Sequence, residues 1–318
     1  MLGVICYIIE PHTGQWAASR LLRSLTKQMG AMEIFQNVSE GPLRLSIFAG
    51  VFAVMALLEL LSPSRKLDHA KGARWFTNIA IGGIDSLVVR LMALFVIPLA
   101  AVSTAFWAQS QNWGLLNWTA LPQWLEIAIA VVVLDLAIYG QHVASHKIPM
   151  LWSFHQMHHS DVDIDVTTAI RFHPIEIALS MLWKIVVVLA LGPAALAVVI
   201  FEVILNGCAM FNHANLHLPP FLDRMLRLVI VTPDFHRVHH SIIHAETDSN
   251  YGFNLSVWDR FFGTYIPQPR KGHQGMTIGL PNHQSEKPTG LVWSLALPFA
   301  GTKTSAGKTP AQNKRIGK

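Results

Sequence analysis

Long apolar segments alternate with short polar ones along the chain. Residues 43–61, 86–107 and 121–141 are almost wholly apolar, and each is close to the ~20 residues that an α-helix needs to cross the hydrocarbon core of a bilayer. Residues 175–211 are apolar for nearly twice that length, with an interruption at Gly192-Pro193 that predicts a helical hairpin or one kinked helix. We therefore expect an all-α integral membrane bundle of four to five spans.

Charged residues are scarce, and their positions predict an orientation in the membrane. They make up 14% of the 318 residues, against about 25% in soluble domains. Four basic residues lie between positions 62 and 85, whereas residues 108–120 contain no Lys or Arg and are flanked by tryptophans. The positive-inside rule then places 62–85 in the cytoplasm and 108–120 outside. Both ends of the 175–211 hairpin and the segment after 141 would face the cytoplasm.

These patterns divide the chain into four parts. Residues 1–42 form an N-terminal segment, in which we expect translation to begin at Met29 or Met32. Residues 43–120 hold the first two spans, and residues 121–268 hold further spans and most of the histidines. Residues 269–318 form a C-terminal cytoplasmic segment with a basic tail, which we interpret as a disordered, solvated end and not as a nucleic-acid-binding arm.

Histidine is the residue type that stands out, because 12 of the 16 histidines lie between positions 142 and 244. They form two His-x3-His pairs and two His-x2-His-His triplets. Side chains at positions i, i+3 and i+4 share one face of a helix, so each group can direct its imidazoles toward one point. The pairs are His142/His146 and His213/His217, and the triplets are His155/His158/His159 and His236/His239/His240.

A metal site explains this clustering best. Many imidazoles packed together without metal would repel when protonated and lack partners when buried. With only two cysteines, far apart in the chain, the ligands must be nitrogen or oxygen. Nine or ten histidines suffice for two ions, and imidazole suits iron, zinc and copper alike. A membrane zinc hydrolase and a non-enzymatic metal-binding protein are the alternatives, although the HExxH motif of many zinc hydrolases is absent.

The order of motifs resembles one known family. Asp135-x3-Tyr139-x2-His142-x3-His146 is followed by WSFHQMHHS (152–160), TPDFHRVHHS (232–241), NYG (250–252) and WDRFFGTY (258–265). This order is similar to that of the fatty acid hydroxylase/sterol desaturase superfamily over about 125–268. In detail it is most similar to the alkylglycerol monooxygenase-like branch.

The resemblance implies a membrane monooxygenase. Two iron ions would use O2 as co-substrate and two electrons from an external donor of cytochrome or ferredoxin type. The substrate would be a lipid or sterol from the bilayer, which is hydroxylated or desaturated at a C–H bond. Carried over by position, the metal ligands would be His142, His146, His155, His158, His159, His213, His236, His239 and His240.

A few further residues carry open expectations. His217 could be a tenth ligand or an interfacial polar residue. Asp135 is expected to orient His142 or His146, because metal-bound histidines commonly donate to carboxylates. Asn250 and Asp259 could act in the same way or could tie loops together.

Overall fold

The computed structural model describes residues 40–95, 100–285 and 287–300. Within these ranges the chain forms helices and loops and no β-strand. Five helices are long and apolar enough to cross a membrane, which confirms the all-α membrane bundle. They are α2 (Glu40–Leu61), α3 (Lys71–Phe95), α5 (Gln123–Lys147), α7 (Pro174–Leu191) and α8 (Ala195–His213).

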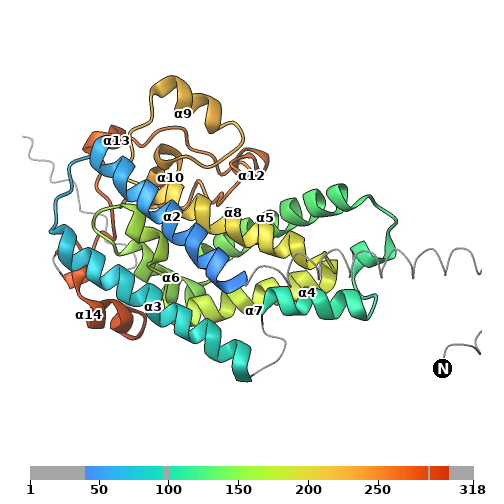
Figure 1. The fold of residues 1–318 in the computed structure, drawn as a ribbon. Helices are drawn as coiled ribbons and strands as arrows, with labels where there is room; N and C mark the ends of the chain where they lie inside the picture. Colours follow the sequence, from blue (N-terminus) through green and yellow to red (C-terminus); the bar gives the residue numbers. More distant parts are fainter. Residues whose placement is uncertain (1–39, 96–99, 286, 301–318) are drawn as a thin grey trace, which may run out of the picture.

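Shorter helices gather at the two ends of this bundle (Figure 1). The right-hand end in Figure 1 holds α4 (Ala101–Ser110), η1 (Leu115–Trp118) and the turn between α7 and α8. The left-hand end, which we call the cap, is built by helices that include α6 (Pro149–His159), η2 (Val166–Ile170), α9 (Pro220–Leu226), α10 (Pro233–His239), α11 (His244–Thr247), α12 (Val257–Phe261), α13 (Gly272–Gly275), η3 (Lys287–Thr289), α14 (Leu291–Ala296) and η4 (Leu297–Phe299).

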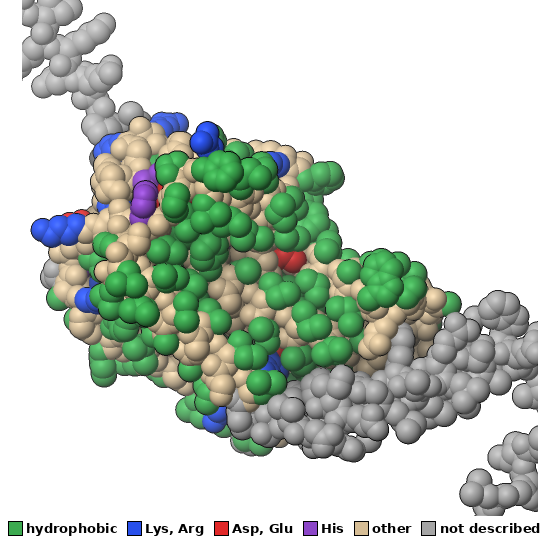
Figure 2. Space-filling view, turned by 45° about the horizontal axis from the view of Figure 1, so that its top comes forward, with side chains coloured by type: hydrophobic (Ala, Val, Ile, Leu, Met, Phe, Trp, Pro, Cys, Tyr) green, Lys and Arg blue, Asp and Glu red, His purple; other side chains and the backbone are tan. Residues whose placement is uncertain are grey.

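The outer surface of the bundle is apolar. Leu60, Leu94 and Val186 are 69%, 72% and 55% exposed, and Figure 2 shows hydrophobic side chains over much of one face, with Lys and Arg gathered toward its left end. Soluble proteins rarely expose continuous apolar areas of this size. The surface therefore fits a bundle surrounded by lipid, with its basic residues concentrated at the cap.

The predicted second span, residues 86–107, is wrong in its boundaries. The helix begins at Lys71 and runs to Phe95, and a separate helix, α4, follows from Ala101. The first turns of α3 look too polar for a membrane helix in the sequence because Arg74, Thr77 and Asn78 occur there. All three are at most 1% exposed and point into the cap instead of into lipid.

The predicted hairpin over 175–211 is present, with its break at Gly192. This residue ends α7 in the left-handed conformation, at φ 62°, which glycine adopts without steric cost. The turn also meets Gly114 at close range, since a Cβ added to Gly114 would lie 2.4 Å from the Gly192 nitrogen. Two glycines therefore allow the 111–118 segment to pack against the hairpin tip.

A buried ion network joins α3 to the segment that follows α6. The Arg74 guanidinium donates to both carboxylate oxygens of Asp161, at 2.8 and 3.0 Å, and to Asp165 at 2.8 Å. Arg171 donates to the carbonyl oxygens of Met157 and Pro288 at 3.0 and 2.9 Å. The Arg74 charge holds the pKa of the buried Asp161 down to about 2. This network fixes the C-terminal end of α6 in the cap.

Candidate metal centre

The helices of the cap bring the histidine motifs to one place. His142 and His146 lie on the last turns of α5, which continues six residues beyond the predicted end of the third span. The chain then turns at Pro149, the first residue of α6, and α6 carries the first triplet. His213 ends α8. The second triplet lies at the C-terminal end of α10, with His240 as its C-cap, and the Thr232 side chain caps the start of this helix.

The nine predicted histidines fall into two groups. Within each group, one nitrogen of every imidazole lies within 4.8 Å of the others. The first group contains five residues from α5, α6 and α10, and the second contains four from α6, α8 and α10. The first is His142, His146, His155, His159 and His239, and the second is His158, His213, His236 and His240.

Carbonyl and carboxylate oxygens set the tautomers of three histidines of the first group, which are His142, His155 and His239. His142 Nδ1 lies 2.7 Å from the Tyr251 carbonyl oxygen, and His239 Nδ1 lies 2.7 Å from that of Ser249. A carbonyl oxygen can only accept, so Nδ1 carries the proton and Nε2 keeps a free lone pair. The Nε2 atoms of His142, His146, His155, His159 and His239 are buried and have no partner among the described residues.

A carboxylate completes this arrangement at His155. Glu176, in the first turn of α7, has Oε1 2.6 Å from His155 Nδ1. At His146, the Asp248 carboxylate lies 3.6 Å from Nδ1. Histidines that bind metal commonly donate their second nitrogen to such groups, which orients the ring and strengthens its lone pair. Glu176 was not singled out in the sequence, where the only sign of it is an acidic residue at the start of a membrane helix.

The nitrogens of the second group lie close together. His213 Nε2 is 3.1 Å from His158 Nε2 and 3.0 Å from His236 Nε2, and His240 Nε2 is 3.2 Å from His236 Nε2. His213 and His158 direct Nδ1 at carbonyl oxygens, 2.7 Å from Ala209 and 3.2 Å from Arg171. The ring of Phe172 stacks on His158 at 4.4 Å and shields it from water.

Burial keeps these imidazoles neutral. His236 and His240 are 0% exposed, and burial moves the pKa of each far below its usual value. Burial likewise lowers the pKa of His239 to about 3, although its hydrogen bond to Ser249 opposes the shift. Neutral imidazole is the form that binds a metal ion.

The NYG segment positions two histidines through its backbone. Asp259 accepts from the backbone nitrogens of Tyr251 and Gly252 at 2.8 and 2.7 Å. Asn250 donates to the Phe235 carbonyl oxygen at 2.9 Å and accepts from Ile266 N at 2.7 Å. Asn250 and Asp259 therefore tie loops together, which was one of their two predicted roles. They also fix the carbonyl groups that face His142 and His239.

One further expectation is wrong, and the structure favours one of the two interpretations left open for another residue. Asp135 does not contact a histidine; its Oδ2 accepts from Trp258 Nε1 at 2.7 Å and from Leu255 N at 3.2 Å. The expected orienting role is therefore wrong. In the apolar span the carboxylate instead binds an indole donor from the WDRFFGTY motif, since buried acids need a partner. His217 is exposed and lies outside both groups, which favours its interpretation as a surface residue.

One ion cluster within the spans was also missed. Glu202 on α8 contacts Lys184 Nζ on α7 at 3.0 Å and the Arg44 guanidinium on α2. Charged groups inside a bilayer are costly unless paired, so this cluster specifies how three spans pack. The sequence offered Glu202 and Lys184 as isolated charges and did not show that they meet.

Comparisons with known proteins agree with the motifs. Residues 127–264 match the family model described as fatty acid hydroxylase. The chain carries a fatty acid hydroxylase domain. This segment contains all nine histidines of the two groups, together with Glu176 and the NYG segment.

Curated relatives extend the similarity beyond that domain. The chain is 26% identical to the ornithine lipid hydroxylase OlsE of Rhizobium tropici, over 84% of this chain and 79% of the relative. It is 28% identical to the human alkylglycerol monooxygenase, over 76% of this chain, and spans about half of that relative's length (52%). Rat cholesterol 25-hydroxylase is 24% identical over 54% of this chain and 56% of the relative. No solved structure matches the chain.

The predicted enzyme class is thereby confirmed. The matched domain and the relatives are hydroxylases and monooxygenases, and the five apolar helices make the protein an integral membrane enzyme. The chain is an oxygen-dependent lipid hydroxylase in class, and its similarity to the fatty acid hydroxylase family model lies over residues 127–264.

Proposed function

We propose that the nine histidines bind two iron ions and that the protein uses O2 to hydroxylate a lipid at the cap. The observation that carries this proposal is the row of buried, unpartnered Nε2 atoms in the first group. A buried nitrogen lone pair without a donor is costly. Five of them lie close together, and hydrogen bonds at Nδ1 hold the rings of His142, His155 and His239, so the ligand set is arranged before the metal arrives.

The residues present fit a pair of metal ions. Imidazole nitrogens bound to one ion at about 2.0–2.1 Å lie about 3 Å apart when the bonds are at right angles. The separations of 3.0–3.2 Å in the second group have this size. His158 and His159 are neighbours on α6, and His239 and His240 are neighbours on α10. In each of these pairs, one ring belongs to the first group and the other to the second. The same two helices would therefore hold both ions.

When bound, the two irons would supply the oxygen activation that attack on an unreactive C–H bond requires. The protein's own part is to fix the ligands, to exclude water and to admit the lipid. His155 is held by Glu176, and His142 and His239 are held by backbone carbonyl groups. Phe172 and the fully buried ring of Tyr251 close the site against water.

The charge pattern supports a cytoplasmic position for the cap. Arg65 and Lys66 lie between α2 and α3 at the cap end, whereas the 111–118 segment lies at the opposite end with the exposed Trp113 and Trp118. The positive-inside rule then assigns the histidines to the cytoplasmic side. There an external electron donor of cytochrome or ferredoxin type could reach them, and we include such a donor in the proposal.

An isotope experiment tests the proposed reaction. The iron-loaded protein is supplied with a chemical reductant, a lipid extract and isotope-labelled dioxygen, and the lipids are analysed by mass spectrometry. We expect labelled oxygen in a lipid alcohol with wild-type protein and none with His158→Ala or His239→Ala. Labelled product from both variants at the wild-type rate would rule out the assigned centre.

A further inference from the structure

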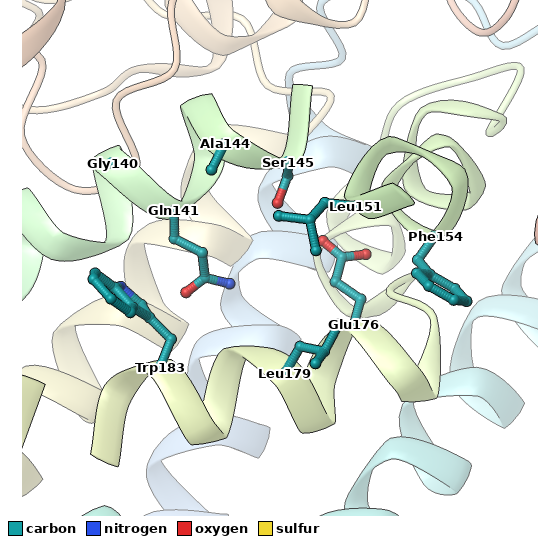
Figure 3. Close-up of a pocket in the computed structure, with 9 residues that line it drawn as sticks. All are labelled: Gly140, Gln141, Ala144, Ser145, Leu151, Phe154, Glu176, Leu179 and Trp183. Atoms are coloured by element: carbon teal, nitrogen blue, oxygen red, sulfur yellow. The ribbon is translucent and has the colours of Figure 1, made fainter. Parts of the chain in front are cut away.

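A cavity lies beside Glu176, the carboxylate that binds His155 Nδ1. It has a volume of about 260 Å³ and is lined by residues of α5, α6 and α7 (Figure 3). Its walls are mostly apolar and are made by Leu151, Phe154, Leu179 and Trp183. Leu179 and Trp183 are also 37% and 42% exposed on the lipid-facing surface of α7, so the cavity borders the bilayer.

Three polar groups point into this apolar space. Figure 3 shows the amide of Gln141, the hydroxyl of Ser145 and the carboxylate of Glu176 directed toward its centre. Glu176 is 8% exposed. Its Oε1 accepts the His155 proton, while its Oε2 has no hydrogen-bond partner among the described residues. An apolar pocket with a few convergent polar groups is the usual form of a small-molecule site.

The free carboxylate oxygen selects the chemistry of the ligand. Glu176 beside a donating imidazole can accept a hydrogen bond and has none to give. Asp85 on α3 lies near enough to interact electrostatically with Glu176, and its Oδ1 is also buried without a partner in the described chain. None of the nine lining residues is basic. Such a site disfavours an anion and is completed by a hydroxyl or ammonium group.

We propose that this cavity binds the polar end of the substrate lipid and selects lipids with a neutral or cationic hydrogen-bond donor over fatty carboxylates. The proposal rests on the proposed lipid hydroxylation and adds the substrate class to it. The donor binds Glu176 Oε2, Gln141 and Ser145 provide further polar contacts, and the apolar chain passes between α5 and α7 into the bilayer. The Glu176 carboxylate that orients His155 thus also selects the substrate by the hydrogen-bond donor at its polar end.

Three ligands with one chain length test the selectivity. Octylglycerol, octylamine and octanoate are titrated against metal-free protein in nanodiscs near neutral pH, with empty nanodiscs as the blank, and binding is followed by calorimetry. A hydrogen bond to a charged group that is lost, or replaced by repulsion, costs at least about a tenfold change in affinity. We expect the diol and the amine to bind at least tenfold more tightly than octanoate. Equal affinity for octanoate would overturn the proposal.

Two glycine variants test the location. Gly140 lines the cavity, and a Cβ added there meets nothing within 4 Å. Gly83 on α3 is likewise exposed, with the same space around it, and is not among the lining residues. Gly140→Leu should weaken octylglycerol binding at least tenfold, while Gly83→Leu, the matched control, should bind as wild type does. Equal binding by both variants would place the ligand elsewhere.

Glu176→Gln tests the selecting group. The amide keeps an oxygen for His155 and removes the negative charge, so octanoate should gain at least tenfold in affinity. Unchanged discrimination would exclude Glu176 as the selecting residue. Because these titrations use metal-free protein, they are independent of turnover. Selective binding without labelled product would refute the hydroxylase proposal alone, whereas labelled product without selective binding would refute only this inference.

Discussion

The Asp259→Asn variant tests whether a residue that contacts no histidine fixes the geometry of the proposed metal ligands. Asp259 touches no histidine; it accepts from Tyr251 N at 2.8 Å, Gly252 N at 2.7 Å and Thr264 Oγ1 at 2.6 Å. An asparagine has one acceptor oxygen in place of two, and its NH2 group would face a donor. At least one charge-assisted hydrogen bond is lost, which costs about 1.5–3 kcal/mol of stability.

The effect should reach the metal through the backbone. The Tyr251 carbonyl oxygen accepts from His142 Nδ1, and the neighbouring Ser249 carbonyl accepts from His239 Nδ1. Loss of such orienting partners typically lowers metal affinity by about 10–100-fold. We therefore expect Asp259→Asn to lower both the unfolding temperature and the iron affinity, the latter measured by titration against a competing chelator.

A surface variant provides the control. Asp68 is an exposed aspartate in the loop between α2 and α3, and Asp68→Asn should leave iron affinity and unfolding temperature unchanged. A destabilised Asp259→Asn protein with wild-type iron affinity would refute the reasoning. It would show that the carbonyl groups of the NYG segment do not set the ligand geometry.

Three other predictions concern the cap. Arg74→Leu leaves two buried aspartates without their partner and should destabilise the protein by about 3–5 kcal/mol; an unfolding temperature within error of wild type would contradict this. His213→Ala should lose bound iron from the purified protein while His217→Ala retains it, and equal retention by both variants would remove His213 from the ligand set. Metal-free protein should lose stability as pH falls. Burial lowers the pKa of His239 to about 3, whereas the unfolded chain takes up its proton near 6.5, so protons favour unfolding between these values. Full stability should hold above about pH 6.5, and a melting temperature that stays constant down to pH 4 would contradict the burial of neutral histidines.

Local periodicity was enough to predict much of the fold and of the candidate site. Apolar runs of spanning length predicted α2, α5 and the α7–α8 hairpin, because a span must satisfy its own backbone within a helix. The i, i+3 and i+4 spacing of the triplets predicted that their imidazoles converge.

Contacts between distant segments could not be predicted in this way. The start of α3 was missed because Arg74 looks like a loop residue until its partner Asp161, 87 positions away, is placed beside it. Asp135 was assigned to a nearby histidine on the same helix, but its donor, Trp258, lies 123 positions further along. Glu176 meets His155 only because α6 and α7 fold back on each other. Spacing within one helix carries no information about such pairs.

The metal content of the purified protein tests the central claim most directly. Protein produced in iron-replete medium is analysed for iron and zinc by elemental mass spectrometry, together with the His158→Ala and His239→Ala variants. The account predicts two irons per chain in the wild type and loss of most bound iron in both variants, with the protein still inserted in the membrane. A single zinc per chain, or full metal retention by both variants, would contradict it.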